Sequence, residues 1–322
     1  MKVLVTGGAG YIGSHTARVL RRHGHEVILY DNLSTGHDFL AKGFELVVGD
    51  IGDEAKVRHQ LGRVEAVVHF AAHAYVGEST VNPRKYFRNN VEDGLTLLNA
   101  ALDIGVRKFV FSSTCAIYGA PDKVPITEDA PKQPINPYGV TKLFLERALE
   151  AYDAAYALRY AALRYFNAAG ADESGEIGEV HDPETHLIPL ALRATGKASS
   201  PLQVFGTDYP TADGTCIRDY IHVNDLAEAH ALALDRLSNG EPSFAVNLGT
   251  GKGHSILEIL KSVEEVTGRR VNRIEAPRRV GDPPALVADP ARAQRLLGWR
   301  ATRTLRDIVS TAWKWMQASS SG

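Results

Sequence analysis

The sequence lacks the features that mark several specialised classes of protein. Its 322 residues include only two cysteines, Cys115 and Cys216, in no Cys-x-x-Cys pair, so it predicts neither a disulfide framework nor a structural zinc site. No apolar run approaches the roughly 20 residues of a membrane span. The formal net charge of -2 leaves no basic excess for nucleic acid. Because the N-terminus leads directly into a predicted strand, with no signal-peptide pattern, we expect a cytoplasmic enzyme without nucleic-acid or membrane partners.

The strongest positive pattern occupies the first 31 residues. Residues 2–6 form the continuous apolar run of a strand buried on both faces of a parallel sheet. A glycine-rich turn, a helical pattern ending at Gly24 and a second strand at 26–30 follow. Because glycine lacks a Cβ, a diphosphate can approach such a turn closely, and the helix behind it directs free N–H groups at the anion. We predict a dinucleotide site at Gly7, Gly10, Tyr11, Ile12 and Gly13.

An acidic residue, Asp31, ends the second strand. Its carboxylate is suited to accept hydrogen bonds from the two ribose hydroxyls of an adenosine, and it would repel a 2′-phosphate. The sequence therefore favours NAD over NADP. A glycine-rich turn without a ligand is the alternative, and its position between a strand and a helix speaks against it.

Strand and helix patterns alternate through the first half of the chain. Further strands are predicted at 44–48, 66–70 and 108–112, with a helix at 54–61. Such alternation predicts parallel strands and right-handed crossovers, hence an α/β fold with a doubly wound (Rossmann) sheet. We expect an NAD-binding domain over residues 1–170, to which about 220–260 return. Residues 171–322 would mainly form a smaller, discontinuous α/β substrate-binding domain.

Ligands of doubly wound sheets bind outside the carboxyl ends of the strands. Asp50 and Ile51 follow the third strand and offer an acceptor for the adenine amino group and an apolar wall for its ring. The fourth strand is followed by Phe70, Ala71 and Ala72, where the small alanines let a cofactor lie close. Each residue alone is equally well explained as an ordinary strand end.

Tyr138 and Lys142 are the predicted catalytic pair. Four residues apart on a helix, they share one face, so the ammonium can stay close to the phenol. Lowering the pKa of a tyrosine from about 10 to about 7 requires roughly 4 kcal/mol of phenolate stabilisation, which a cation supplies. Such a tyrosinate would take a hydroxyl proton while hydride leaves the same carbon. Thr114, at the end of the hydroxyl-rich run from Ser112, is placed to donate to the substrate oxygen.

No metal site is predicted. His69 and His73 are four residues apart but fall on a strand and the turn after it, so they do not share a face. His222 lies where a helix is expected to begin, with Asn224 or Asp225 as the cap.

Several of these motifs are shared with a known family. They are Gly7-x-x-Gly10-x-x-Gly13, Ser112-Ser113-Thr114, Tyr118-Gly119 and Pro137-Tyr138-Gly139-x-x-Lys142, and with them the chain resembles the extended short-chain dehydrogenase/reductase family. Further segments make it similar to the branch that epimerises UDP-sugars at C4: 31–33, 76–79, 164–167, 214–223 and 278–282. The segment around Arg218 is far more specific than any glycine pattern.

The resemblance implies a tightly held NAD and the interconversion of UDP-glucose and UDP-galactose. Tyr138 would remove the 4-hydroxyl proton while hydride passes from C4 to the nicotinamide, and the 4-keto sugar would rotate and take the hydride back on its other face. It also implies further cofactor contacts from Asn32, Asn89 and Phe166, beside Tyr138 and Lys142. The implied substrate contacts are Thr114 and Tyr138 at the sugar, Asn167, Arg218, Arg279 and Asp282 at the diphosphate and ribose, and Leu187 and Phe205 at the uracil.

Two positions depart from the pattern of the family. Ala74 stands where many epimerases place a lysine near the cofactor ribose, which puts that contact in doubt. Leu286 stands where some members have a bulky aromatic, and the smaller side chain leaves a UDP-N-acetylhexosamine open as substrate.

Other functions share part of this set of motifs. A UDP-pentose epimerase, acting on arabinose or xylose, needs the same residues and stays open. A 4,6-dehydratase needs an Asp-Glu pair after Thr114, where this chain has Cys115-Ala116. A non-catalytic NAD-sensing module is disfavoured because Tyr138 and Lys142 are both present. The resemblance also favours a homodimer, formed through helices predicted at 88–104 and 138–156.

Overall fold

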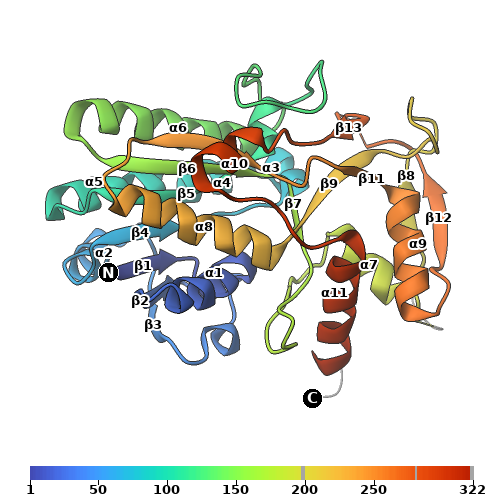
Figure 1. The fold of residues 1–322 in the computed structure, drawn as a ribbon, viewed down its shortest axis with the longest axis horizontal. Helices are drawn as coiled ribbons and strands as arrows, with labels where there is room; N and C mark the ends of the chain where they lie inside the picture. Colours follow the sequence, from blue (N-terminus) through green and yellow to red (C-terminus); the bar gives the residue numbers. More distant parts are fainter. Residues whose placement is uncertain (197–199, 280, 320–322) are drawn as a thin grey trace.

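The computed structural model describes residues 1–196, 200–279 and 281–319, and its largest element is a parallel sheet of seven strands (Figure 1). Their spatial order is β10-β6-β5-β4-β1-β2-β3. The chain reverses direction across the sheet between β1 and β4, as in doubly wound folds, and so confirms the predicted class. The strands are β1 (Lys2–Thr6), β2 (Glu26–Asp31), β3 (Glu45–Val48), β4 (Ala66–His69), β5 (Lys108–Thr114), β6 (Arg159–Tyr165) and β10 (Phe244–Leu248).

Helices cover both faces of this sheet. Along β1, Val3 and Val5 pack on one side against α1 (Tyr11–Arg22) and α8 (Val223–Ser238). Leu4 points to the other side, where the helices are α2 (Glu54–Leu61), α5 (Gly94–Ile104) and α6 (Pro137–Tyr156). Both faces of the strand are therefore buried, which explains its unbroken apolar run.

A second group of elements follows β6 in the chain. β9 (Ile217–His222) pairs with β7 (Asn167–Ala169), β11 (Gly253–Ser255) and β13 (Ala285–Leu286), and β8 (Leu202–Phe205) pairs with β12 (Arg273–Ala276). A separate apolar core lies among α7 (Leu187–Arg193), α9 (Ile256–Thr267) and α11 (Leu305–Ser319). These helices lie at the right of the large sheet in Figure 1. Among the described residues, no helix has the length and apolarity needed to cross a bilayer.

Shorter elements connect these parts. They are the 3-10 helices Asp38–Ala41 and Cys115–Tyr118, and the α-helices α3 (Val76–Val81), α4 (Pro83–Tyr86) and α10 (Ala291–Leu297).

The helix predicted at 88–104 is not a continuous α-helix. Its first part is a π-helix, Phe87–Asp93, and α5 begins only at Gly94. A π-turn inserts an extra residue into the helix and changes which side chains share a face. Here it directs Asn90 inward. The Asn90 side chain accepts a hydrogen bond from the His73 N–H (2.9 Å) and donates to the His73 carbonyl (3.0 Å) and to the Thr141 hydroxyl of α6 (3.1 Å).

The predicted cap of α8 is also wrong. The helix begins at Val223, and the ring of His222 accepts a hydrogen bond from the Asn224 N–H (3.1 Å). Asp225 lies inside the helix, and its carboxylate instead accepts hydrogen bonds from Thr302 and Arg303, far along the chain.

A buried ion pair joins α6 to the large sheet. Glu146 accepts three hydrogen bonds from Arg164 of β6 (2.9, 3.2 and 2.6 Å), and Ser113 of β5 donates a fourth (2.5 Å). Arg164 also donates to Tyr118 (3.0 Å), and all of these side chains are buried. Because Ser113 precedes Thr114, this network holds the strand end that the sequence assigned to chemistry.

Removing one charge of this pair should destabilise the fold strongly. The Glu146→Gln variant leaves the Arg164 guanidinium buried without its counter-ion, so we expect a loss of about 3–5 kcal/mol in unfolding free energy, measured by urea denaturation. The matched control is Arg147→Ala, which breaks the exposed pair with Glu150 on the same helix and should cost less than about 1 kcal/mol. Equal costs for the two variants would contradict the role given to the buried pair.

Candidate active site

Two positions of the glycine-rich turn lie so close to other backbone atoms that they have no room for a side chain. Gly7 has a φ of +69°, and a Cβ there would lie 2.6 Å from the Ala71 nitrogen. A Cβ on Gly13 would lie 2.2 Å from the Gly7 carbonyl oxygen. The close approach of the end of β4 therefore requires glycine at Gly7, and the close approach of α1 to the Gly7 carbonyl requires it at Gly13.

Gly10 is different. Its φ of −84° suits any residue, and a Cβ there would meet only the Gly7 oxygen, at 3.3 Å. Gly10 is also the N-cap of α1, and no side chain caps that end of the helix. A Cβ at Gly10 would require the Gly7 carbonyl to shift by only a few tenths of an ångström, so the fold needs glycine less here than at Gly7 or Gly13. What glycine preserves is space before a helix N-terminus. That space fits the diphosphate of a dinucleotide.

Asp31 and its neighbours form the adjoining edge of the site. The Asp31 carboxylate is buried and accepts hydrogen bonds from the backbone N–H groups of Ala9 (2.9 Å) and Leu33 (2.8 Å). Burial raises the pKa of Asp31. A carboxylate has about four acceptor sites, so two remain for the hydroxyls of a ribose. Asn32 donates to Asp50 (2.9 Å), which brings these two predicted residues together.

The other predicted cofactor residues lie on the elements that surround the turn. Ile51 is buried, and the ring of Phe70 packs against His230 with centroids 4.7 Å apart. Ala71 and Ala72 are half-buried, directly after β4. Tyr11 begins α1 and donates to the Gly170 carbonyl (2.6 Å), while Ile12 packs against the core of that face. Asn89 is half-buried in the π-helix, and Phe166 is buried just after β6.

The three hydroxyl residues at the end of β5 have different partners. Ser112 shares a hydrogen bond of 2.6 Å with the Tyr165 hydroxyl, and Ser113 is tied to Glu146. Thr114 accepts a hydrogen bond from the Ala116 N–H (3.2 Å), which caps the short 3-10 helix after it. Of these three residues, Thr114 is the one that interacts with the phenol of Tyr138, and this contact lowers the pKa of that phenol.

Lys142 is held by the strand and not by the phenol. Its ammonium donates to the Ser112 carbonyl (2.8 Å) and lies 6.0 Å from the centre of the Tyr138 ring. Asn136 caps α6 by accepting from Gly139 (2.8 Å), which fixes the first turn where Tyr138 lies. The predicted shared face is present, and Thr114, Tyr138 and Lys142 meet at the carboxyl end of β5.

Burial opposes ionisation of both members of the pair. It raises the pKa of Tyr138 well above 10, with a further rise from nearby Tyr165, and it lowers the pKa of Lys142 to about 7. The protein alone therefore keeps the phenol protonated. A positive charge bound beside the phenol would favour the phenolate.

The residues implied for the substrate converge on β9 and the segment after β12. Arg218 is buried and hydrogen-bonds Asp282, and the guanidinium of Arg279 lies 4.1 Å above the ring of Phe205. Asn167 of β7 donates to the Asp219 carbonyl (3.1 Å) on β9. Val280, within the same motif as Arg279 and Asp282, lies outside the described residues. A planar guanidinium over an aromatic ring remains available for bidentate contact with a phosphate.

The remaining positions lie at the rim of the same region. Leu187 is the first residue of α7, and Leu286 is paired in register with Arg218 and packs against the cluster that includes Phe166. Ala74 is exposed after β4.

Three side chains near the site were not among the predicted residues. Asn90 donates to Thr141 of α6, and Tyr165 shares a hydrogen bond with Ser112 of β5. Their positions follow from the π-turn and from strand pairing, which the sequence pattern does not show. The third, His181, belongs to a group with Glu179, Glu184 and His186 whose Glu-x-His spacings were visible in the sequence.

Comparisons with known proteins agree with this architecture. A family model described as the NAD dependent epimerase/dehydratase family matches residues 3–249. The chain is 50% identical to a UDP-glucose 4-epimerase of Rhizobium meliloti, over 99% of this chain and 98% of that protein. It superimposes with a TM-score of 0.95 on the crystal structure of UDP-glucose 4-epimerase from Brucella ovis in complex with NAD, at 52% identity and 97% coverage of both chains.

A second solved structure carries a nucleotide as well. It is UDP-glucose 4-epimerase from Bifidobacterium longum in complex with NAD+ and UDP, with a TM-score of 0.94, 38% identity and 99% coverage of both chains. The family match spans more than half of the chain, and the relatives extend over nearly all of it. This chain belongs to the NAD-dependent epimerase/dehydratase family.

Proposed function

We propose that this chain is an NAD-dependent 4-epimerase that interconverts UDP-glucose and UDP-galactose. The observation that carries the proposal is the meeting of Thr114, Tyr138 and Lys142 at the end of β5, in a chain whose full-length relatives are named UDP-glucose 4-epimerases. Bound NAD supplies a hydride acceptor at the sugar carbon and can return the hydride. Tyr138 is the base for the 4-hydroxyl proton, and Thr114 orients that hydroxyl.

The open space before Gly10 and the acceptors of Asp31 support the proposed grip on the cofactor. The turn and α1 would hold its diphosphate, Asp31 its adenosine ribose, and Asn32, Asp50 and Ile51 its adenine end. Phe70, Ala71, Ala72, Asn89 and Phe166 would line its course, and Lys142 its nicotinamide ribose.

The arginines support the proposed grip on UDP. Arg218 and Arg279 would bind the diphosphate with Asn167, Asp282 would bind the ribose, and Leu187 and Phe205 would enclose the uracil. These residues belong to the smaller, later elements, which we propose form the substrate-binding domain. A firm hold on the nucleotide leaves the sugar free to rotate between oxidation and reduction, as an epimerase requires.

Replacing the phenol tests the proposed base. Tyr138→Phe removes the proton acceptor and keeps the ring, so kcat for UDP-galactose, assayed without added NAD, should fall about 10²- to 10⁴-fold. The NAD released on denaturation should stay at the wild-type amount. Tyr152→Phe on the same helix, whose hydroxyl bonds Asn99, is the matched control and should retain full activity.

Two results would contradict this assignment. One is an active Tyr138→Phe variant. The other is a wild-type protein that epimerises UDP-arabinose, UDP-xylose or UDP-N-acetylglucosamine but leaves UDP-galactose unchanged.

A pair of glycine variants separates ligand binding from folding. Gly10→Ala should keep the circular dichroism of the wild type, because its Cβ meets only one backbone oxygen, but its bound NAD should drop sharply. Gly13→Ala should fail to give folded protein, because its Cβ would overlap the Gly7 carbonyl. A Gly10→Ala protein that purifies with one NAD per chain would show that this space is not the diphosphate site.

We also propose a homodimer formed through α5 and α6. Large apolar side chains are exposed on both helices: Val140 and Phe144 near the start of α6, and Ile104 at the end of α5. Exposed apolar side chains on adjacent helices are typical of an interface between copies.

A charge placed on this face should separate the copies. Phe144→Glu is expected to halve the mass found by sedimentation equilibrium. Phe39 has the same 47% exposure but lies far from these helices, so Phe39→Glu should leave the mass unchanged. A wild-type monomer, or a dimer that survives Phe144→Glu, would argue against this interface.

A further inference from the structure

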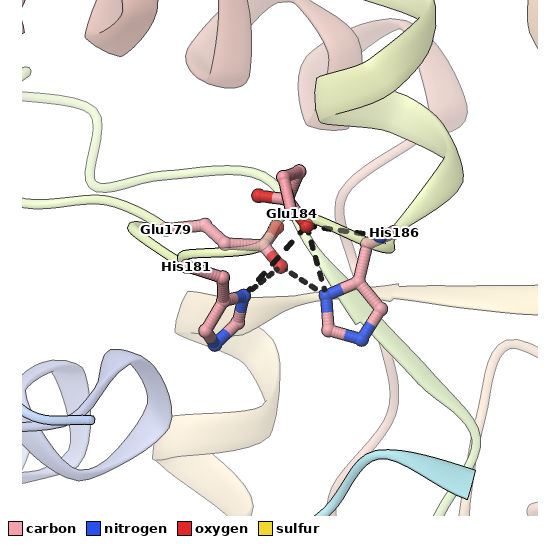
Figure 2. A group of neighbouring side chains, drawn as sticks. All are labelled: Glu179, His181, Glu184 and His186. Atoms are coloured by element: carbon pink, nitrogen blue, oxygen red, sulfur yellow. Dashed lines mark hydrogen bonds and ion pairs between the residues drawn. The ribbon is translucent and has the colours of Figure 1, made fainter. Parts of the chain in front are cut away.

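Four side chains between β7 and α7 direct their donor atoms at one point. Figure 2 shows the carboxylates of Glu179 and Glu184 facing the rings of His181 and His186. One ligand atom from each residue lies within 4.8 Å of all the others. Among the described residues, this is the one group of three or more histidine, cysteine, aspartate or glutamate side chains with that property. Nothing in the proposed reaction uses it.

The spacings suit ligands of a metal ion. The Nδ1 atom of His181 lies 3.0 Å from a Glu179 oxygen, and a Glu184 oxygen lies 3.8 and 3.7 Å from the Nδ1 atoms of His181 and His186. Donors on a tetrahedral zinc ion, bound at about 2.0–2.1 Å, are about 3.4 Å apart. These three distances bracket that value, and the fourth, between His186 Nδ1 and Glu179, is shorter. His186 also hydrogen-bonds Glu179 directly.

Burial makes a compensating charge necessary. The side chains of Glu179 and Glu184 are only 5% and 1% exposed. Buried carboxylates are stable only with a counter-charge. His181 Nδ1 is buried and makes no hydrogen bond of acceptable geometry, although Glu179 is 3.0 Å away. The Nδ1 atom of His181 therefore does not point directly at the Glu179 oxygen. This orientation is expected when both atoms are ligands that face a common centre.

Protonated histidines are the alternative source of that charge. Two imidazolium rings would then stand with centroids 5.1 Å apart and repel each other. One ion shared by two neutral rings avoids this repulsion and uses all four donors.

The ligands are held in place by their surroundings. The Glu184 oxygen that faces the histidines also accepts from the backbone N–H groups of Thr185 (2.8 Å) and His186 (2.9 Å). The ring of His181 packs edge-on against Tyr11 and Tyr75, with centroids 6.4 and 5.8 Å apart. Such outer contacts orient ligands in metal sites.

We propose that Glu179, His181, Glu184 and His186 bind one divalent transition-metal ion, with Zn²⁺ as the ion that fits best. Two imidazole nitrogens and two carboxylate oxygens are ligands that zinc accepts, and four protein ligands are typical of a structural zinc site. The ion would tie the segment before α7 to Tyr11 of the glycine-rich turn through His181. It would thereby set the position of Leu187, the first residue of α7, without taking part in proton or hydride transfer.

Metal content and zinc titration test this site. Untagged wild-type protein with its NAD bound is dialysed against a chelator and reloaded with Zn²⁺, and zinc is measured by mass spectrometry and by calorimetry. We expect one zinc per chain. The double variant His181→Asn, His186→Asn keeps a polar atom near each Nδ1 but removes the nitrogen ligands, so it should bind none. His59→Gln, which changes an exposed histidine on α2, is the matched control and should bind one.

Two further measurements keep the test independent of activity and of folding defects. X-ray absorption at the zinc edge should show nitrogen and oxygen ligands at about 2.0–2.1 Å and no sulfur, which excludes Cys115 and Cys216. If the double variant does not fold, the single variant Glu184→Gln should bind zinc at least tenfold more weakly. The proposal fails if reloaded wild type holds no stoichiometric zinc, if the variants bind zinc as the wild type does, or if sulfur is among the ligands.

Discussion

The hydrogen bond from Lys142 to the Ser112 carbonyl is the contact on which the arrangement of the active site depends. It joins the first two turns of α6 to the end of β5 and so sets the phenol of Tyr138 beside Thr114. The Glu146–Arg164 pair holds the same helix against the same strands one turn further along. Together they bring the proposed base, Tyr138, and the hydroxyl of Thr114 to the strand end where a doubly wound sheet binds its ligands.

This anchoring has an electrostatic cost. Taking both side chains out of water raises the pKa of Tyr138 and lowers that of Lys142, so burial disfavours the charged form of each. A base that ionises only beside a bound cation cannot remove protons before the oxidant is in place. In the proposed reaction, the turn at Gly10 and the arginines of the later elements serve one purpose, which is to bring the oxidant and the sugar to that phenol together.

Much of this could be predicted from the sequence because its signals are local. The unbroken apolar strand at 2–6, the turn at Gly7 and the four-residue spacing of Tyr138 and Lys142 each depend on neighbouring residues only. The inward position of Asn90 and the partnership of Ser112 with Tyr165 depend on contacts across 17 to 53 positions, which periodicity does not reveal. The His222 cap is a local contact, and it was missed because histidine is not among the side chains usually preferred at a helix N-cap. The Lys142 ammonium was expected beside the phenol, and it lies on a carbonyl because a buried ammonium needs a hydrogen-bond acceptor.

The most direct test of this account is the pKa of Tyr138 itself. NMR titration of protein labelled with ¹³C at the tyrosine Cζ, with Tyr138→Phe to assign the resonance, reports that value with oxidised NAD bound. The account predicts that Tyr138 ionises below the ordinary tyrosine pKa of about 10 in that complex. A phenol that stays protonated beyond pH 10 with oxidised NAD in place would contradict it.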